Sequence, residues 1–440
     1  MTRALLITYV WPPTGGVGVQ RVLKLAKYLP EQGVTPAVLT VANPSVPLTD
    51  VSLLRDVPEG LEVLRARTFE PGYATKQAAW KEAREGAPAP GLAARIKRSV
   101  MGLARQALVP DPQILWQPDA QRVLLQRLRA RPDDVVFITA PPFSMFLSAP
   151  LVRALGKSAV VLDYRDEWLT LRTQYEMLSR WGAVVGDTME HTVLRCAHAV
   201  TVATEAFRES LLDRFRFLDP ARVRTIPNGY DPDDFPVDPA SAPEPPTDRF
   251  VITYAGTVFK QNSPRGLLAA LRTLHAREPE LARLLRVRFI GRIVDTELDA
   301  FEGSEALGVE RVGFIDKDQV TPALSASHMT LCLLDIMPGA ERIYPAKIFE
   351  LMYLGRPCLT LAPPGALADL SRAHQLGPVI APRDEPAIVD ELVRALRSFR
   401  AGTFSRRAGA VGIERYHRRA IAAEFAELFR EAAALASRSR

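Results

Sequence analysis

The sequence predicts an α/β protein with two doubly wound parallel sheets, one in each half of the chain. Short runs of β-branched residues alternate with longer helical patterns, which is typical of parallel strands joined by helices. The alternation stops at the proline-rich stretch 236–248 and then starts again. A chain of 440 residues, of which 47% are hydrophobic and 24% charged, is long enough for two such Rossmann-like halves.

The first half comprises residues 1–238. The predicted strands are Ala4–Val10, Thr35–Val41, Asp134–Thr139, Ala159–Asp163, Ala199–Thr204 and Val223–Pro227. The predicted helices are Gly15–Gln32, Met145–Leu155 and one around Asp187–Cys196. Because strands and helices alternate, we expect a parallel sheet with helices on both faces.

The second half comprises residues 249–411 and follows a stiff linker at 239–248. The predicted strands are Phe250–Tyr254, Val287–Ile290, Val309–Phe314, Met329–Leu334, Pro357–Leu361 and Pro378–Ala381. Helices are predicted at Pro264–His275 and Ala346–Leu354. The tail, residues 412–440, shows one long helical pattern, which we expect to cross both domains.

Charge and cysteine content exclude several classes of protein. The 56 basic and 50 acidic residues give a net charge of +6, too small an excess to indicate nucleic-acid binding. The three cysteines are far apart and fit neither a disulfide framework nor a metal pair, which favours the cytoplasm. No stretch reaches the roughly 18 to 20 apolar residues of a membrane span.

The basic excess is concentrated in Lys76–Arg105, within an insertion at about 70–118. Apolar residues are interleaved with its lysines and arginines. Two interpretations remain open for this segment. It lies on an anionic membrane surface at the cytoplasmic face, where it admits a lipid-linked acceptor, or it forms a solvated helical hairpin.

Two motifs of the first half follow predicted strands, at the edge where open α/β sheets bind ligands. YVWPPTGGVGVQR, from Tyr9 to Arg21, places glycines where a helix begins, so that free backbone N–H groups favour an anion such as phosphate. LDYRDEW places Arg165 and Asp166 directly after a strand. A plain turn explains the glycines equally well, and a surface ion pair explains the two charges.

Two further motifs lie in the second half. GTVFKQNSPRG follows its first strand, and Lys260 and Arg265 there are suited to a diphosphate, although they are also explained as solvated loop charges. In PAKIFELMYLGRP, Lys347 and Glu350 lie one turn apart where a helix begins. The alternative for this pair is a solvent-exposed ion pair.

Together these motifs resemble the GT-B glycosyltransferases of the retaining, family-4-like group, along nearly the whole chain. The resemblance rests on PPTGGVGVQR, LDYRDEW, IPNGYDPDDF, YAGTVF and PAKIFELMYLGRP. It implies transfer of a sugar with retention from a nucleotide-diphospho-sugar to a glycan, lipid-linked or small-molecule acceptor. It also implies a cleft with the donor held mainly by the second half and the acceptor by the first. No cofactor or metal is required if Lys260 and Arg265 carry the charge of the leaving diphosphate.

The resemblance also implies roles for individual residues. The candidates for the catalytic centre are Arg165, Asp166, Lys260, Arg265 and Glu341. The candidates for donor binding are Gly15, Gly16, Gly256, Thr257, Gly291, Arg292, Gly313, Phe314, Ile315, Tyr344, Pro345, Lys347, Ile348 and Glu350. Glu350 matches the carboxylate that binds the ribose hydroxyls, and residues 313–315 border the base. The candidates for acceptor binding are Tyr9, Trp11, Gln20 and Trp168.

Three positions depart from the family pattern. Arg342 stands where an acid is expected, Arg165 replaces a histidine, and Thr257 replaces an arginine. Two alternatives therefore stay open, a nucleotide-sugar 2-epimerase and a non-catalytic nucleotide-binding partner of a transferase. The epimerase would need a histidine at a strand end, which neither half shows. Asp231 and Asp233 lie among turn formers, so no metal site is predicted there.

Overall fold

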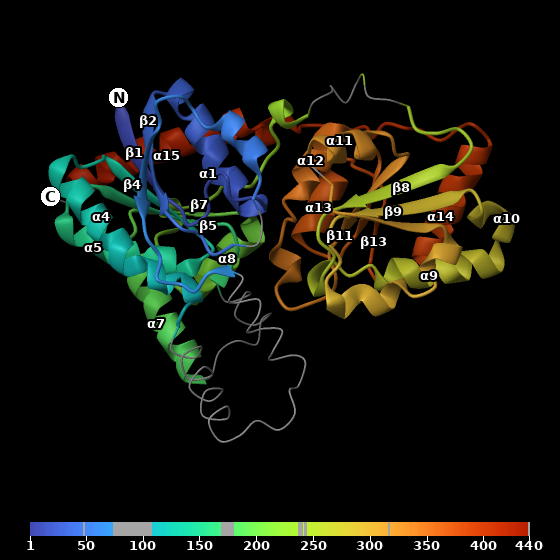
Figure 1. The fold of residues 1–440 in the computed structure, drawn as a ribbon, viewed down its shortest axis with the longest axis horizontal. Helices are drawn as coiled ribbons and strands as arrows, with labels where there is room; N and C mark the ends of the chain where they lie inside the picture. The colour runs from blue at the N-terminus through green and yellow to red at the C-terminus, as the bar shows by residue number, and fades with distance from the viewer. Residues whose placement is uncertain are drawn as a thin grey trace. The chain divides into compact units, whose positions relative to one another are not determined.

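The chain folds into two compact units, each described here by itself (Figure 1). The structure, a computed structural model, describes residues 1–46, 49–73, 108–168, 180–235, 241, 244–315 and 317–438. Unit 1 joins Met1–Pro227 to Arg418–Arg440, and unit 2 is Asn228–His417. The basic segment Lys76–Arg105 lies outside the described residues.

This division differs from the predicted boundary at residue 238. The chain leaves unit 1 at Pro227, so the proline-rich stretch belongs to unit 2. The predicted tail also divides, because residues 412–417 belong to unit 2 and only helix α15 (Arg418–Arg438) returns to unit 1.

Unit 1 is built on a seven-stranded parallel sheet in the order β3-β2-β1-β4-β5-β6-β7. Its strands are β1 Thr2–Ile7, β2 Val34–Val41, β3 Glu62–Ala66, β4 Val135–Ala140, β5 Ala159–Tyr164, β6 Ala199–Val202 and β7 Val223–Thr225. The sequence analysis missed β3, because this short edge strand carries Glu62 and Arg65 and shows no apolar run.

Helices cover both faces of the unit 1 sheet, as predicted. They are α1 Val17–Tyr28, α4 Gln117–Ala130, α5 Ala149–Leu155, α7 Arg180–Cys196 and α8 Glu205–Arg214. Apolar side chains of α1 and α15 pack on one face, and those of α4, α5, α7 and α8 pack on the other. Figure 1 shows α15, the last helix of the chain, lying along the sheet of unit 1.

Unit 2 is built on a six-stranded parallel sheet in the order β10-β9-β8-β11-β12-β13. Its strands are β8 Phe250–Ala255, β9 Leu285–Ile290, β10 Val309–Gly313, β11 Met329–Leu333, β12 Cys358–Leu361 and β13 Val379–Ile380. Its helices are α9 Arg265–Arg277, α10 Pro279–Ala282, α11 Lys317–Ser325, α12 Lys347–Leu354, α13 Ala366–Ala373 and α14 Glu385–Arg400. One core lies among α9, α10 and α14, and the other among α12, α13 and the chain crossovers.

Both sheets contain a point where the strand order reverses direction. In unit 1 this switch point separates β1 from β4, and in unit 2 it separates β8 from β11. Open α/β sheets bind ligands outside the carboxyl ends of the strands at such points. Within the described residues, no helix combines the length and the hydropathy that crossing a bilayer requires.

Candidate functional site

A buried ion pair near the switch point of unit 1 connects α1 to the strands β4, β5 and β6. Arg21 of α1 donates to both carboxylate oxygens of Asp163 on β5, from Nε at 3.0 Å and from Nη2 at 2.7 Å. Asp163 also accepts the hydroxyls of Thr139 and Thr201, each at 2.6 Å. Arg21 further donates to the carbonyl oxygens of Ile226 and Pro227, each at 2.8 Å. The pair is therefore fully hydrogen-bonded and holds the crossover segment to unit 1.

The glycine loop of unit 1 approaches the LDYRDEW motif through Arg165. Arg165 donates from Nη1 to the carbonyl oxygen of Gly18 at 2.8 Å, and from Nη2 to that of Pro141 after β4. A Cβ atom on Gly18 would lie 3.0 Å from the Arg165 Nη1 atom. The close approach is thus at Gly18, which the sequence analysis did not single out. Gly15 is half-buried, whereas Gly16 is exposed and adopts a φ of 100° where α1 begins.

The predicted acceptor-binding aromatic residues are buried instead of lining a surface. Tyr9, Trp11 and Trp168 are 2%, 4% and 1% exposed. The Tyr9 hydroxyl donates to Glu70 Oε1 at 2.5 Å, and Trp168 stacks on Phe143 with ring centroids 4.8 Å apart. These three aromatic side chains belong to the core of unit 1, and their role in acceptor binding stays a prediction. Gln20 is half-buried and Asp166 is exposed.

In unit 2, glycines follow three adjacent strands at the carboxyl edge of the sheet. Gly256, Gly291 and Gly313 come after β8 and β9 and at the end of β10, with φ angles of 136°, 122° and 78°. A Cβ atom on Gly291 would lie 2.5 Å from the carbonyl oxygen of Gly256. Side chains are therefore excluded where backbones come this close. The aromatic ring of Phe314, directly after β10, is 72% exposed.

The loop after Gly256 is held by buried polar side chains. The Tyr254 hydroxyl donates to the carbonyl oxygen of Thr257 at 3.0 Å and accepts from Asn262 Nδ2 at 2.8 Å. Asn262 Oδ1 accepts the backbone N–H of Phe259 at 2.9 Å. Val258 N–H donates to the carbonyl oxygen of Arg292 at 2.8 Å. Lys260 projects from this rigid loop as an exposed side chain.

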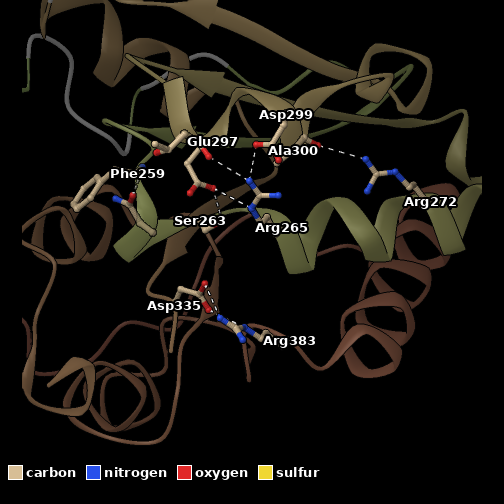
Figure 2. A network of polar contacts seen from close by, with 11 residues as sticks. Phe259, Ser263, Arg265, Arg272, Glu297, Asp299, Ala300, Asp335 and Arg383 are labelled. Carbon is tan, nitrogen blue, oxygen red and sulfur yellow. Dashed lines mark hydrogen bonds and ion pairs between the residues drawn. The ribbon is translucent and has the colours of Figure 1, made fainter. Parts of the chain in front are cut away.

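Arg265, a predicted diphosphate ligand, is paired with two carboxylates (Figure 2). Its Nη2 atom lies 2.6 Å from Asp299 Oδ1, and its Nε atom lies 3.5 Å from Glu297 Oε2. Glu297 also accepts the Ser263 hydroxyl at 2.6 Å. Figure 2 shows a second ion pair nearby, in which Arg383 contacts Asp335 after β11 at 3.2 Å. The charge of Arg265 is thus already neutralised within the fold.

Helix α12 brings Lys347 to the end of β8. The Lys347 Nζ atom donates to the carbonyl oxygen of Ala255 at 2.9 Å and lies 3.8 Å from the centroid of the Tyr254 ring. A Cβ atom on Gly256 would lie 2.5 Å from this Nζ atom. Burial lowers the pKa of Lys347 from 10.5 to about 8. Glu350 lies on the same first turn and is half-buried.

The loop before α12 contains Arg342, which stands where the family pattern has an acidic residue. The Arg342 guanidinium donates to the Glu341 carboxylate, and Glu341 is exposed. A Cβ atom on Gly365, after β12, would lie 2.5 Å from the Glu341 carbonyl oxygen. Tyr344, Pro345 and Ile348 follow along the chain; the first two are half-buried, and Ile348 is buried in the core.

The IPNGYDPDDF motif forms the crossover between the units. Tyr230 stacks on Tyr353 at the far end of α12, with centroids 4.6 Å apart, and its N–H donates to the Tyr416 carbonyl oxygen at 3.0 Å. Asp231 accepts the N–H of Asp233 at 3.2 Å, as in a turn. No three His, Cys, Asp or Glu side chains in the described ranges are grouped as metal ligands would be.

Comparisons with known proteins decide the family. Residues 15–229 match the family described as "Glycosyl transferase 4-like domain". The chain is a family-4-like glycosyltransferase, identified by its N-terminal half. No match is found among curated protein sequences.

Solved structures confirm the GT-B fold of this glycosyltransferase over the whole chain. It resembles sucrose-phosphate synthase from Thermosynechococcus elongatus with a TM-score of 0.62 and 16% identity, over 98% of this chain and 99% of that one. It resembles HepE from Anabaena, solved with UDP and glucose, with a TM-score of 0.61 and 13% identity, over 98% and 100% of the two chains. It also resembles the lipopolysaccharide outer core galactosyltransferase WaaB, with a TM-score of 0.59 and 12% identity, over 98% of this chain and 99% of that one.

Proposed function

We propose that this glycosyltransferase moves a sugar, with retention, from a nucleotide-diphospho-sugar bound at the carboxyl edge of the unit 2 sheet. The observation that carries this proposal is the composition of that edge. Gly256 and Gly291 let the loops at this edge pack closely, Gly313 has open space beside its Cα atom, and α12 begins there with a cation and the Glu350 carboxylate. A carboxylate accepts two hydroxyl hydrogen bonds, which suits the ribose of a nucleotide.

The transfer needs no nucleophile from the protein. The bond between the anomeric carbon and the diphosphate oxygen breaks, and the acceptor oxygen bonds to the same face of the sugar. The acceptor proton passes to the departing diphosphate oxygen. Side-chain cations at the edge of unit 2 stabilise the charge that develops on the diphosphate, which is usually the largest contribution of such a site.

Unit 1 supplies the acceptor side in this proposal. The free N–H groups where α1 begins, at Gly16, and the adjacent Arg165 and Asp166 are its polar groups. The acceptor is a glycan, a lipid-linked sugar or a small molecule, and the protein acts in the cytoplasm. The basic segment Lys76–Arg105 is the proposed contact with an anionic membrane surface on the cytoplasmic side.

UDP-glucose is the first donor to test, because HepE was solved with UDP-glucose. We expect the wild type to be stabilised by UDP or another nucleoside diphosphate in a thermal-shift assay, and to hydrolyse a matching nucleotide sugar slowly to the retained anomer. Glu350→Gln is expected to weaken nucleotide binding by about 10- to 100-fold, because it removes charge-assisted hydrogen bonds to the ribose. Glu280→Gln, at an exposed glutamate that is paired with Arg283 and lies outside the candidate site, is the matched control and should bind normally.

Stabilisation by none of UDP, GDP, ADP and dTDP would contradict the donor class. Binding without any hydrolysis or transfer would instead favour a non-catalytic partner of a transferase. The Glu341–Arg342 pair is the observation that keeps this second function in view, because it places a cation where the family pattern has an acid.

A further inference from the structure

The cationic side chains at the carboxyl edge of unit 2 differ in whether the fold supplies them with a carboxylate partner. Arg265 is neutralised by Asp299 and Glu297, and Arg383 by Asp335. Lys347 is not: across the described residues, no carboxylate forms an ion pair with it. Its contacts are one carbonyl oxygen, from Ala255, and the face of the Tyr254 ring.

The surroundings of Lys347 compensate only in part for this missing counter-charge. The groups that face it are Tyr254 on β8, Cys332 on β11, Cys358 on β12 and Glu350 on its own helix. Burial raises the pKa of Tyr254, of Cys332 and of Cys358, so these three remain neutral. Glu350, three residues further along α12, favours the charged ammonium electrostatically but does not offset its burial, so the pKa of Lys347 remains lowered. Removing a cation from water in such a setting costs folding free energy unless an anion binds to it.

The position of the ammonium is also suited to a ligand. It lies where a Cβ atom of residue 256 would be, at the end of β8 and beside the switch point with β11. Residue 257, the next along the chain, is a threonine and carries no charge. The ammonium at this strand end comes from α12.

We infer that Lys347 is the principal diphosphate-binding cation of this enzyme, in place of Arg265. The inference rests on the proposed function, because it requires a nucleoside diphosphate at this edge. Gly256 is part of the arrangement, since a side chain there would displace the ammonium. Lys260, exposed on the preceding loop, has a secondary role at most.

The test compares Lys347→Met with the matched control Lys157→Met, at an exposed lysine before β5 of unit 1, by calorimetric titration of UDP. If another nucleoside diphosphate stabilises the wild type better, it replaces UDP as the probe. We expect Lys347→Met to weaken binding by about 10- to 100-fold, the loss typical of a charge-assisted hydrogen bond. Lys157→Met should change it by less than about threefold, because this exposed lysine lies outside the candidate site.

Two further readouts separate ligand binding from folding. The melting temperature of unliganded Lys347→Met should be no lower than that of the wild type, because methionine fills the space without an unpaired charge. Binding of uridine, followed by saturation-transfer NMR, should be unchanged, since uridine carries no phosphate. Together with a weakened UDP titration, these results support the inference.

The inference would be overturned if Lys347→Met bound UDP within twofold of the wild type, or if UDP and uridine binding fell together. Failure of the proposed function looks different. In that case the wild type itself binds no nucleoside diphosphate, and both the donor class and the role of Lys347 are wrong.

Discussion

Arg21 in unit 1 and Lys347 in unit 2 are two cations close to the switch point of a sheet, the first buried and the second half-buried. Arg21 is 2% exposed and is completed by the Asp163 carboxylate and two carbonyl oxygens. Lys347 has one carbonyl oxygen and an aromatic face. Arg21 therefore has its hydrogen-bond and ion-pair partners within the fold, whereas Lys347 retains the capacity to bind an anion.

The largest expected effect, on the free energy of unfolding, comes from breaking the ion pair between Arg21 and Asp163. Asp163→Ala leaves the Arg21 guanidinium buried without a counter-charge, and it removes the acceptor of the Thr139 and Thr201 hydroxyls. Removing one partner of a buried ion pair typically costs about 3 to 5 kcal/mol of unfolding free energy. Urea denaturation measures this loss. Asp166→Ala, in the same motif but exposed, is the control and should change stability by about 0.5 kcal/mol or less.

A loss below about 1 kcal/mol for Asp163→Ala would show that unit 1 does not depend on this pair. It would also weaken the argument about Lys347, because it would show that this fold tolerates a buried cation without a counter-charge.

The smallest expected effect comes from Arg265. Its guanidinium contacts Asp299 and Glu297, so a diphosphate would have to compete with two carboxylates. We expect Arg265→Met to weaken UDP binding by less than about threefold in calorimetric titration, in keeping with a half-exposed ion pair. A loss of tenfold or more would restore Arg265 as the main diphosphate ligand and would mean that the acidic side chains move away when the donor binds.

The two parallel sheets were predictable from the sequence, and so was the glycine-lined edge of unit 2. Strand ends are local features, and Gly256, Gly291 and Gly313 stand directly at them. The pairing of Arg265 was not predictable, because Glu297 and Asp299 are more than thirty residues away and no local pattern links them. The burial of Trp168 was missed for a similar reason, since its partner Phe143 comes from another strand end.

The domain boundary shows the same limit. Prolines mark a stiff segment, but contacts decide which unit a segment joins. Ile226 and Pro227 are held by Arg21, and Tyr230 is held by Tyr353, so the units divide between these anchors. An interaction between residues distant in sequence set the boundary.

The most direct measurement of the central claim is a titration of Lys347 itself, by NMR of protein with ¹³C-labelled lysine Cε atoms, with and without saturating UDP. The free protein should show one lysine resonance with a pKa of about 8, absent from Lys347→Met. A bound diphosphate favours the charged form, so UDP should raise this pKa, and UDP affinity should fall as the pH rises above 8. An identical pKa with and without UDP would contradict the account.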